Sequence, residues 1–177
     1  MKQSARRFPL FALAQVVVVL AVGAALWLAY NPWRWGKLKE DVHVRFPMVP
    51  RLTTTELADW HNKTEVQPLL LDARTEAEYD ASHLPGALRA DSAPLQLGIE
   101  GKFDQPLVVY CTVGFDSAPV AVRFLAQGYK RVQYLEGGIF LWANENRPLE
   151  NKHGATDKVA PADSHYLSFL NRSHRLR

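Results

Sequence analysis

The chain has 177 residues and one cysteine, which excludes an internal disulfide, a CxxC redox pair and a thiolate zinc site. Its net charge of +3 is uneven, because residues 1–51 carry +6, residues 52–150 carry −6 and residues 151–177 carry +3. A nucleic-acid-binding protein normally carries its positive charge on the folded domain, so this distribution argues against nucleic acid as a partner. Basic ends beside an apolar segment favour a membrane surface instead.

The first predicted element is a membrane-spanning helix over residues 8–30, preceded by a basic tail at 1–7. No charge occurs from Phe8 to Tyr30, and a helix of this length would extend about 34 Å, enough for a hydrocarbon core of about 30 Å. A cleaved signal peptide usually has a shorter apolar core and small residues before the cut, where this chain has Trp27 and Leu28. The sequence therefore predicts an uncleaved single-pass anchor in the cell membrane.

The segment 31–50 contains three prolines and is interpreted as a juxtamembrane linker. The positive-inside rule gives only a weak preference for one orientation, because three basic residues precede the predicted span and four lie between it and the domain. On balance we expect the C-terminal domain on the cytoplasmic side.

Apolar runs and helical patterns alternate over residues 51–150, and we interpret this region as one α/β domain. Compact apolar runs at 68–74, 106–111 and 131–138 are typical of buried parallel strands, with a further short strand expected before residue 90. Helical patterns occupy 53–63, 75–81, 117–129 and 138–146. The alternation predicts a central parallel sheet flanked by helices.

Residues 151–177 form a basic tail whose one amphipathic segment runs from Ser164 to Leu176. This segment could lie on anionic lipid or on the domain, or it could be a frayed, solvated end.

The lone Cys111 falls at the carboxyl end of the predicted strand 106–111, directly before a helix. Ligands bind at this position in open α/β sheets. The loop would curl around Gly114, so that successive backbone N–H groups could converge on an anion above the sulfur. Those N–H groups and the helix dipole would favour the thiolate over the thiol. A cysteine packed as a small hydrophobe is the alternative that this position leaves open.

Three stretches resemble the successive signatures of the rhodanese-like domain: LLLDARTEAEYDASHLPGAL, VVYCTVGFDSA and YLEGGIFLWANENRPL. They occur in the family's order and cover about residues 51–150. The resemblance implies an α/β domain with a central parallel sheet. It also implies that Cys111 is a sulfur-accepting nucleophile that carries a persulfide between a donor and an acceptor.

The loop departs from the family pattern in its charges. Asp116 stands where the family has an arginine five residues after the cysteine, and Thr112 stands where a basic residue is common. A loop without a cation should bind dianionic thiosulfate poorly, so we expect a small-molecule or protein persulfide donor and a thiol acceptor. Asp116 would oppose the thiolate if it faces inward, or cap the helix beginning at Ser117 if it faces outward. The N–H groups expected to hold the persulfide belong to Thr112, Val113, Gly114, Phe115, Asp116 and Ser117.

Three further residues are expected to support the site. Asp72 and Arg74 could line the cleft, although a structural ion pair is the stronger interpretation, and His83 is expected to tie its loop by hydrogen bonds. Ser82 replaces the glycine usual before that histidine, while Gly137 and Gly138 are interpreted as turn and packing residues. The remaining histidines show no metal-ligand spacing, and no metal or cofactor is expected.

Two other functions compete with sulfur transfer. A phosphatase of the related dual-specificity type would need an arginine after five intervening residues, and no arginine is present there to hold the phosphoryl oxygens. The remaining alternative is a non-catalytic binding or scaffold module tethered to the membrane, in which Cys111 is incidental.

Overall fold

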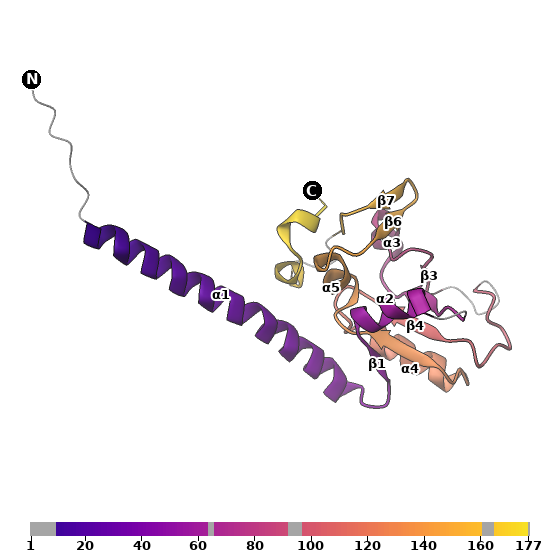
Figure 1. The fold of residues 1–177 in the computed structure, drawn as a ribbon. Helices are drawn as coiled ribbons and strands as arrows, with labels where there is room; N and C mark the ends of the chain where they lie inside the picture. Colours follow the sequence, from indigo (N-terminus) through magenta and orange to yellow (C-terminus); the bar gives the residue numbers. More distant parts are fainter. Residues whose placement is uncertain (1–9, 64–65, 92–96, 161–164, 177) are drawn as a thin grey trace, which may run out of the picture. The chain divides into compact units, whose positions relative to one another are not determined.

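The computed structural model of the chain describes residues 10–63, 66–91, 97–160 and 165–176 (Figure 1). It contains two compact units, Met1–Lys37 and Leu38–Arg177. Helix α1 (Leu10–Arg45) is long and apolar enough to cross a bilayer, and a signal sequence near an N-terminus would have the same properties. The basic tail expected at 1–7 and the first two residues of the expected span lie outside the described residues.

Most of the segment interpreted as a juxtamembrane linker, residues 31–50, is helical. Helix α1 continues through Pro32 and ends at Arg45, two residues before Pro47. The residue before a proline is disfavoured in the helical conformation, which accounts for this end. Val42 is 1 % exposed and packs in the core of the C-terminal unit, so burial stabilises the last turns of the helix.

The C-terminal unit contains a five-stranded parallel sheet, which confirms the predicted fold class. Its strand order is β1-β5-β4-β2-β3, and every neighbouring pair is parallel. All four residues of the central strand β4 are fully buried, as expected for a parallel strand covered on both faces. The strands are β1 (Arg51–Leu52), β2 (Leu69–Asp72), β3 (Leu88–Arg89), β4 (Leu107–Tyr110) and β5 (Val132–Leu135).

The helices of this unit begin and pack where the sequence predicts. Thr53 and Glu56 exchange capping hydrogen bonds at the start of α2, and Thr75 forms a capping box with Glu78 at the start of α3. Helix α2 contacts α5, while α4 packs against β4 and β5. The helices are α2 (Thr54–Lys63), α3 (Glu76–Ala81), α4 (Ser117–Ala126) and α5 (Gly138–Asn144).

The strand order reverses between β2 and β4. After β2 the chain moves outward to β3, and after β4 it moves to β5 on the opposite side. Connections that leave neighbouring strands in opposite directions open a crevice at the carboxyl ends of those strands. Cys111 directly follows β4, so the topology positions the cysteine at this crevice.

The C-terminal segment packs on the domain. After the hairpin β6 (Leu149–Asn151) and β7 (Gly154–Thr156), two short 3₁₀ turns follow at η1 (Leu167–Phe169) and η2 (Arg172–His174). Leu170 is 1 % exposed, and the Asn144 amide donates to the Phe169 carbonyl at 2.7 Å. Of the three arrangements that the sequence leaves open, residues 165–176 adopt the one on the domain.

Leu170→Ala should destabilise the domain by about 2–4 kcal/mol, because it removes buried methyl groups and leaves a cavity. Leu176→Ala is the matched control, since Leu176 is 46 % exposed and its truncation should cost less than about 0.5 kcal/mol. The measurement is denaturant unfolding of the full chain in detergent, followed by circular dichroism. Equal stability of the two variants would show that the C-terminal segment is not part of the cooperative unit.

Candidate functional site: the cysteine loop

The thiol of Cys111 lies among backbone N–H groups of its own loop. The Gly114 N–H donates to Sγ with an N–S distance of 3.1 Å, and the N–H groups of Val113 and Ser117 also favour the thiolate. The Ser117 hydroxyl donates to the Gly114 carbonyl at 3.0 Å and fixes the closing turn before α4. The N–H groups of three of the six residues expected to line the loop therefore favour negative charge on the sulfur.

The shape of the loop depends on a glycine pair from another part of the chain. At the start of α5, the N–H of Ile139 donates to the Cys111 carbonyl at 2.9 Å, and that of Phe140 donates to the Thr112 carbonyl at 3.1 Å. A Cβ atom on Gly138 would lie 2.3 Å from the Cys111 carbonyl oxygen. Gly138, expected to be a turn and packing residue, also permits the contact that orients the cysteine loop.

Gly114 is constrained by both its backbone and its surroundings. Its φ is +102°, a conformation that other residues rarely adopt, and a Cβ there would lie 3.2 Å from the Leu135 carbonyl oxygen. The expected curl of the loop around Gly114 is therefore confirmed.

Burial opposes ionisation of the thiol. Cys111 is 1 % exposed, and burial raises the pKa of its thiol above the ordinary value. The Asp116 carboxylate raises that pKa further, while the N–H groups of Ser117, Val113 and Gly114 lower it. The N–H groups favour the thiolate, as expected, but desolvation by burial outweighs them and the pKa of the Cys111 thiol is raised on balance.

Asp116 faces solvent without capping the helix. It occupies the N-cap position of α4, but its backbone is helical and its side chain makes no capping hydrogen bond. From this exposed position its carboxylate still raises the pKa of the Cys111 thiol. Neither alternative from the sequence describes it fully, since it is turned outward and nevertheless opposes the thiolate.

Asp72 and Arg74 form a buried ion pair at the end of β2. Arg74 Nη2 lies 2.6 Å from Asp72 Oδ2, and the two side chains are 2 % and 0 % exposed. The same nitrogen donates to the Ser82 carbonyl at 2.5 Å. The pair therefore holds the 82–90 loop against the strand that neighbours β4, as the structural interpretation predicts. The Ser82 hydroxyl is buried without a hydrogen-bond partner, so the serine in place of glycine gains no bond here.

His83 ties its loop to two elements. Its Nδ1 donates to the Tyr79 carbonyl at 2.8 Å, and its ring stacks on the Tyr79 ring with the centroids 4.0 Å apart. The His83 N–H donates to the Glu150 carbonyl at 2.8 Å, which joins the loop to β6. These contacts agree with the structural role expected for this histidine.

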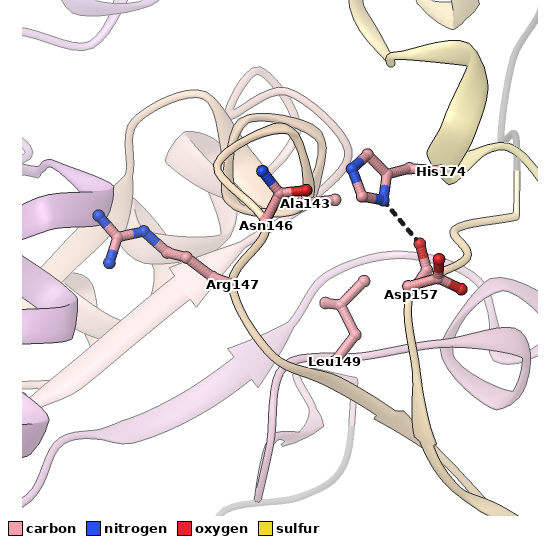
Figure 2. A pocket seen from close by; sticks show the side chains of 6 residues that line it. All are labelled: Ala143, Asn146, Arg147, Leu149, Asp157 and His174. Atoms are coloured by element: carbon pink, nitrogen blue, oxygen red, sulfur yellow. Dashed lines mark hydrogen bonds between the residues drawn. The ribbon is translucent and has the colours of Figure 1, made fainter.

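A separate small pocket of about 120 Å³ lies beside the C-terminal end of α5 (Figure 2). His174 Nδ1 donates to the Asp157 carbonyl at 2.8 Å within it, and the Arg147 side chain points away from His174 toward Glu145, to which it donates at 2.6 Å. No residue of the cysteine loop lines this pocket. Among the described residues, no group of three or more His, Cys, Asp or Glu could hold a metal ion.

Asp116→Asn should increase the reactivity of Cys111. Removing the carboxylate charge lowers the thiol pKa, so a larger fraction is ionised at pH 7.5, and alkylation by iodoacetamide should accelerate about two- to fivefold. The pH–rate profile of the variant should shift to lower pH, measured on the full chain in detergent by mass spectrometry of the Cys111 peptide. Asp80→Asn removes an exposed carboxylate from α3 and should leave the profile unchanged. A wild-type profile in Asp116→Asn would contradict the electrostatic role of Asp116.

Comparison with known proteins assigns the family. The model of the rhodanese-like domain matches residues 53–145, just over half of the chain. A sulfurtransferase of Allochromatium vinosum is 35 % identical over 88 residues, which are 49 % of this chain and 81 % of the relative. The thiosulfate sulfurtransferase GlpE of Pseudoalteromonas translucida is 32 % identical over 90 residues, 50 % of this chain and 81 % of that protein.

Solved structures share the fold. The BH2092 protein from Bacillus halodurans superimposes with a TM-score of 0.54 at 20 % identity, over 71 % of this chain and 93 % of the other. The rhodanese-like domain of the Alr3790 protein from Anabaena gives a TM-score of 0.52 at 19 % identity, over 58 % of this chain and 79 % of the other. With the family match, the parallel sheet and the cysteine loop after its central strand, the chain belongs to the rhodanese-like sulfurtransferase family.

Proposed function

We propose that the protein is a membrane-anchored sulfurtransferase that carries sulfane sulfur as a persulfide on Cys111. The observation that carries this proposal is the hydrogen bond from the Gly114 N–H to Cys111 Sγ at 3.1 Å, in a loop whose Val113 and Ser117 N–H groups also favour the thiolate. Amides arranged in this way stabilise negative charge on sulfur without adding a titratable group. A persulfide on Cys111 would carry such a charge.

In the proposed reaction the Cys111 thiolate attacks the outer sulfur of a persulfide donor. A new S–S bond forms, the donor's S–S bond breaks, and the donor thiolate leaves with the electron pair and takes up a proton from water. An acceptor thiolate then attacks the outer sulfur of the Cys111 persulfide and displaces the Cys111 thiolate. The outer sulfur atom is transferred from the donor to the acceptor without an external oxidant or reductant.

The charge of the loop supports a donor other than thiosulfate. Residues 111–117 contain no lysine or arginine and one carboxylate, that of Asp116. A dianion would be repelled by that carboxylate, whereas a persulfide with one or no charge would be repelled less. The similar protein of Pseudoalteromonas translucida is named a thiosulfate sulfurtransferase, and the carboxylate of Asp116 is the reason to expect this chain to use another donor.

The burial of Cys111 favours an alternative function, that of a non-catalytic binding or scaffold module. A thiol that is 1 % exposed and has a raised pKa is poorly ionised at neutral pH, as in a non-catalytic binding or scaffold module. Such a module would recruit a partner whether or not residue 111 is a cysteine.

Cys111→Ser should abolish sulfur transfer by the full chain in detergent. We expect Cys111-dependent turnover to be at least tenfold faster with glutathione persulfide than with thiosulfate, because thiosulfate carries both of its charges on the group that must approach Asp116, whereas the persulfide group carries at most one. After exposure to the persulfide donor, mass spectrometry should find one added sulfur on the Cys111 peptide. Absence of turnover with glutathione persulfide, thiosulfate and mercaptopyruvate, together with capture of the same partner by wild type and Cys111→Ser, would support the scaffold function instead.

We further propose that residues 8–30 are an uncleaved anchor and that the domain lies on the cytoplasmic side. In α1, Val18 and Val19 are 60 % and 70 % exposed, as expected for side chains that face lipid. The double variant Val18→Asp and Val19→Asp should release the protein into the soluble fraction, because each buried acid costs about 2.5–3.5 kcal/mol at a span centre. Val44→Asp is the control, since residue 44 lies beyond the span. An N-terminal epitope tag that is lost from the mature protein would indicate a cleaved signal instead.

Reporter proteins fused to the C-terminus test the orientation of the domain. A green fluorescent protein fused to the C-terminus should fluoresce if the domain is cytoplasmic, whereas an alkaline phosphatase fusion at the same position should be inactive. The reverse pattern would contradict the proposed orientation.

A further inference from the structure

We propose that residues 38–45, the last turns of α1, complete the cysteine site, and that Arg45 is a positioning residue that draws anionic reactants to the Cys111 loop. Residues 38–45 lie outside the part of the chain that matches the family model, which begins at residue 53. They nevertheless belong to the same compact unit as the cysteine loop. The proposal rests on the proposed function in one respect, that the natural reactant is an anionic sulfur compound.

The first observation is that this segment is fixed to the turn behind the cysteine loop. Val42 packs in the same apolar core as Val109 and Tyr134. Lys39 Nζ lies 3.0 Å from Glu136 Oε2, and the Glu136 side chain is only 7 % exposed. Glu136 directly precedes the glycine pair that orients the carbonyl of Cys111, so an anchored ion pair connects the end of α1 to the loop support.

The second observation is that Arg45 contacts the loop itself. Its Cζ lies 5.4 Å from the centroid of the Phe115 ring, within the range of a cation–π interaction. The Phe115 side chain is partly buried against the core, so the ring gives the guanidinium a fixed support. Arg45 is exposed and, among the described parts of the chain, makes no ion pair with an acidic side chain. Its charge therefore remains available to a reactant in solvent.

The third observation is the charge of the loop without Arg45. Residues 111–117 carry one negative charge and no positive charge, and the negative one belongs to Asp116, which directly follows Phe115. The guanidinium is therefore held over the side chain of the residue that precedes Asp116 in the loop. From its place in α1, Arg45 supplies a cation that the loop sequence lacks.

The test compares two alkylating reagents of similar size, the anion iodoacetate and the neutral iodoacetamide, on Cys111 in the full chain in detergent. The ratio of their rates reports local charge and cancels changes in thiol pKa and access. Arg45→Gln should lower the ratio about two- to fourfold, and Arg45→Lys should retain at least half of the wild-type ratio. Arg123→Gln, which removes an exposed cation from α4, is the matched control and should leave the ratio unchanged.

High salt gives the second readout. The difference between wild type and Arg45→Gln should disappear in 1 M sodium chloride, where the Debye length is about 3 Å. An unchanged ratio in Arg45→Gln would overturn the proposal, and so would an equal slowing of both reagents, which would show that Arg45 supports the loop without attracting anions. Failure of both reagents to label native Cys111 would overturn it as well. Because alkylation needs no sulfur transfer, a protein that shows the charge effect but forms no persulfide would refute the proposed function alone.

Discussion

The cysteine loop depends on two hydrogen bonds from the start of α5 to the carbonyls of Cys111 and Thr112. A peptide group is planar and normally trans, so its C=O and N–H point in opposite directions. When Phe140 of α5 binds the Thr112 carbonyl, the N–H of Val113 in the same peptide group is turned to the opposite side, and this N–H lowers the pKa of the Cys111 thiol. The close approach requires glycine at 138, since a Cβ there would lie 2.3 Å from the Cys111 carbonyl oxygen. The geometry of the site is thus set from outside the loop.

Two opposing contributions to the free energy, hydrogen bonding and burial, decide whether the Cys111 thiol is ionised. A hydrogen bond to a charged group contributes about 1.5–3 kcal/mol, and the bond from the Gly114 N–H to Sγ favours the thiolate by an amount of this order. Burial of an ion costs a comparable amount, and in this loop burial together with Asp116 prevails. A balance between terms of similar size is sensitive to one nearby charge. Asp116, exposed on the loop, therefore influences chemistry at a sulfur that is itself buried, and the role proposed for Arg45 would act on the same balance.

The sequence could predict what depends on local pattern. The alternation of apolar runs and helical segments predicted the parallel sheet, and the run before Cys111 predicted the fully buried strand β4. The support of the loop by Gly138 and the packing of Leu170 could not be predicted, because both depend on contacts between segments distant in sequence. The helical turns up to Arg45 depend on a distant contact as well: the prolines of residues 31–50 do not reveal the helix, and burial of Val42 holds it in place. The raised thiol pKa was missed because spacing reveals nearby amides but not the extent of desolvation.

The construction of the loop also bears on the choice between catalyst and scaffold. A cysteine that merely filled space would pack as well beside turned-away amides, and a small apolar residue could replace it. Here the chain places Gly114 at a φ of +102° and Gly138 at +56°, and each glycine loses about 0.5–1 kcal/mol more conformational entropy on folding than alanine would. This cost is incurred where it directs amides at one sulfur atom. A partner-binding module gains nothing from that arrangement, whereas a persulfide carrier requires it, and the construction of the loop therefore supports sulfur transfer.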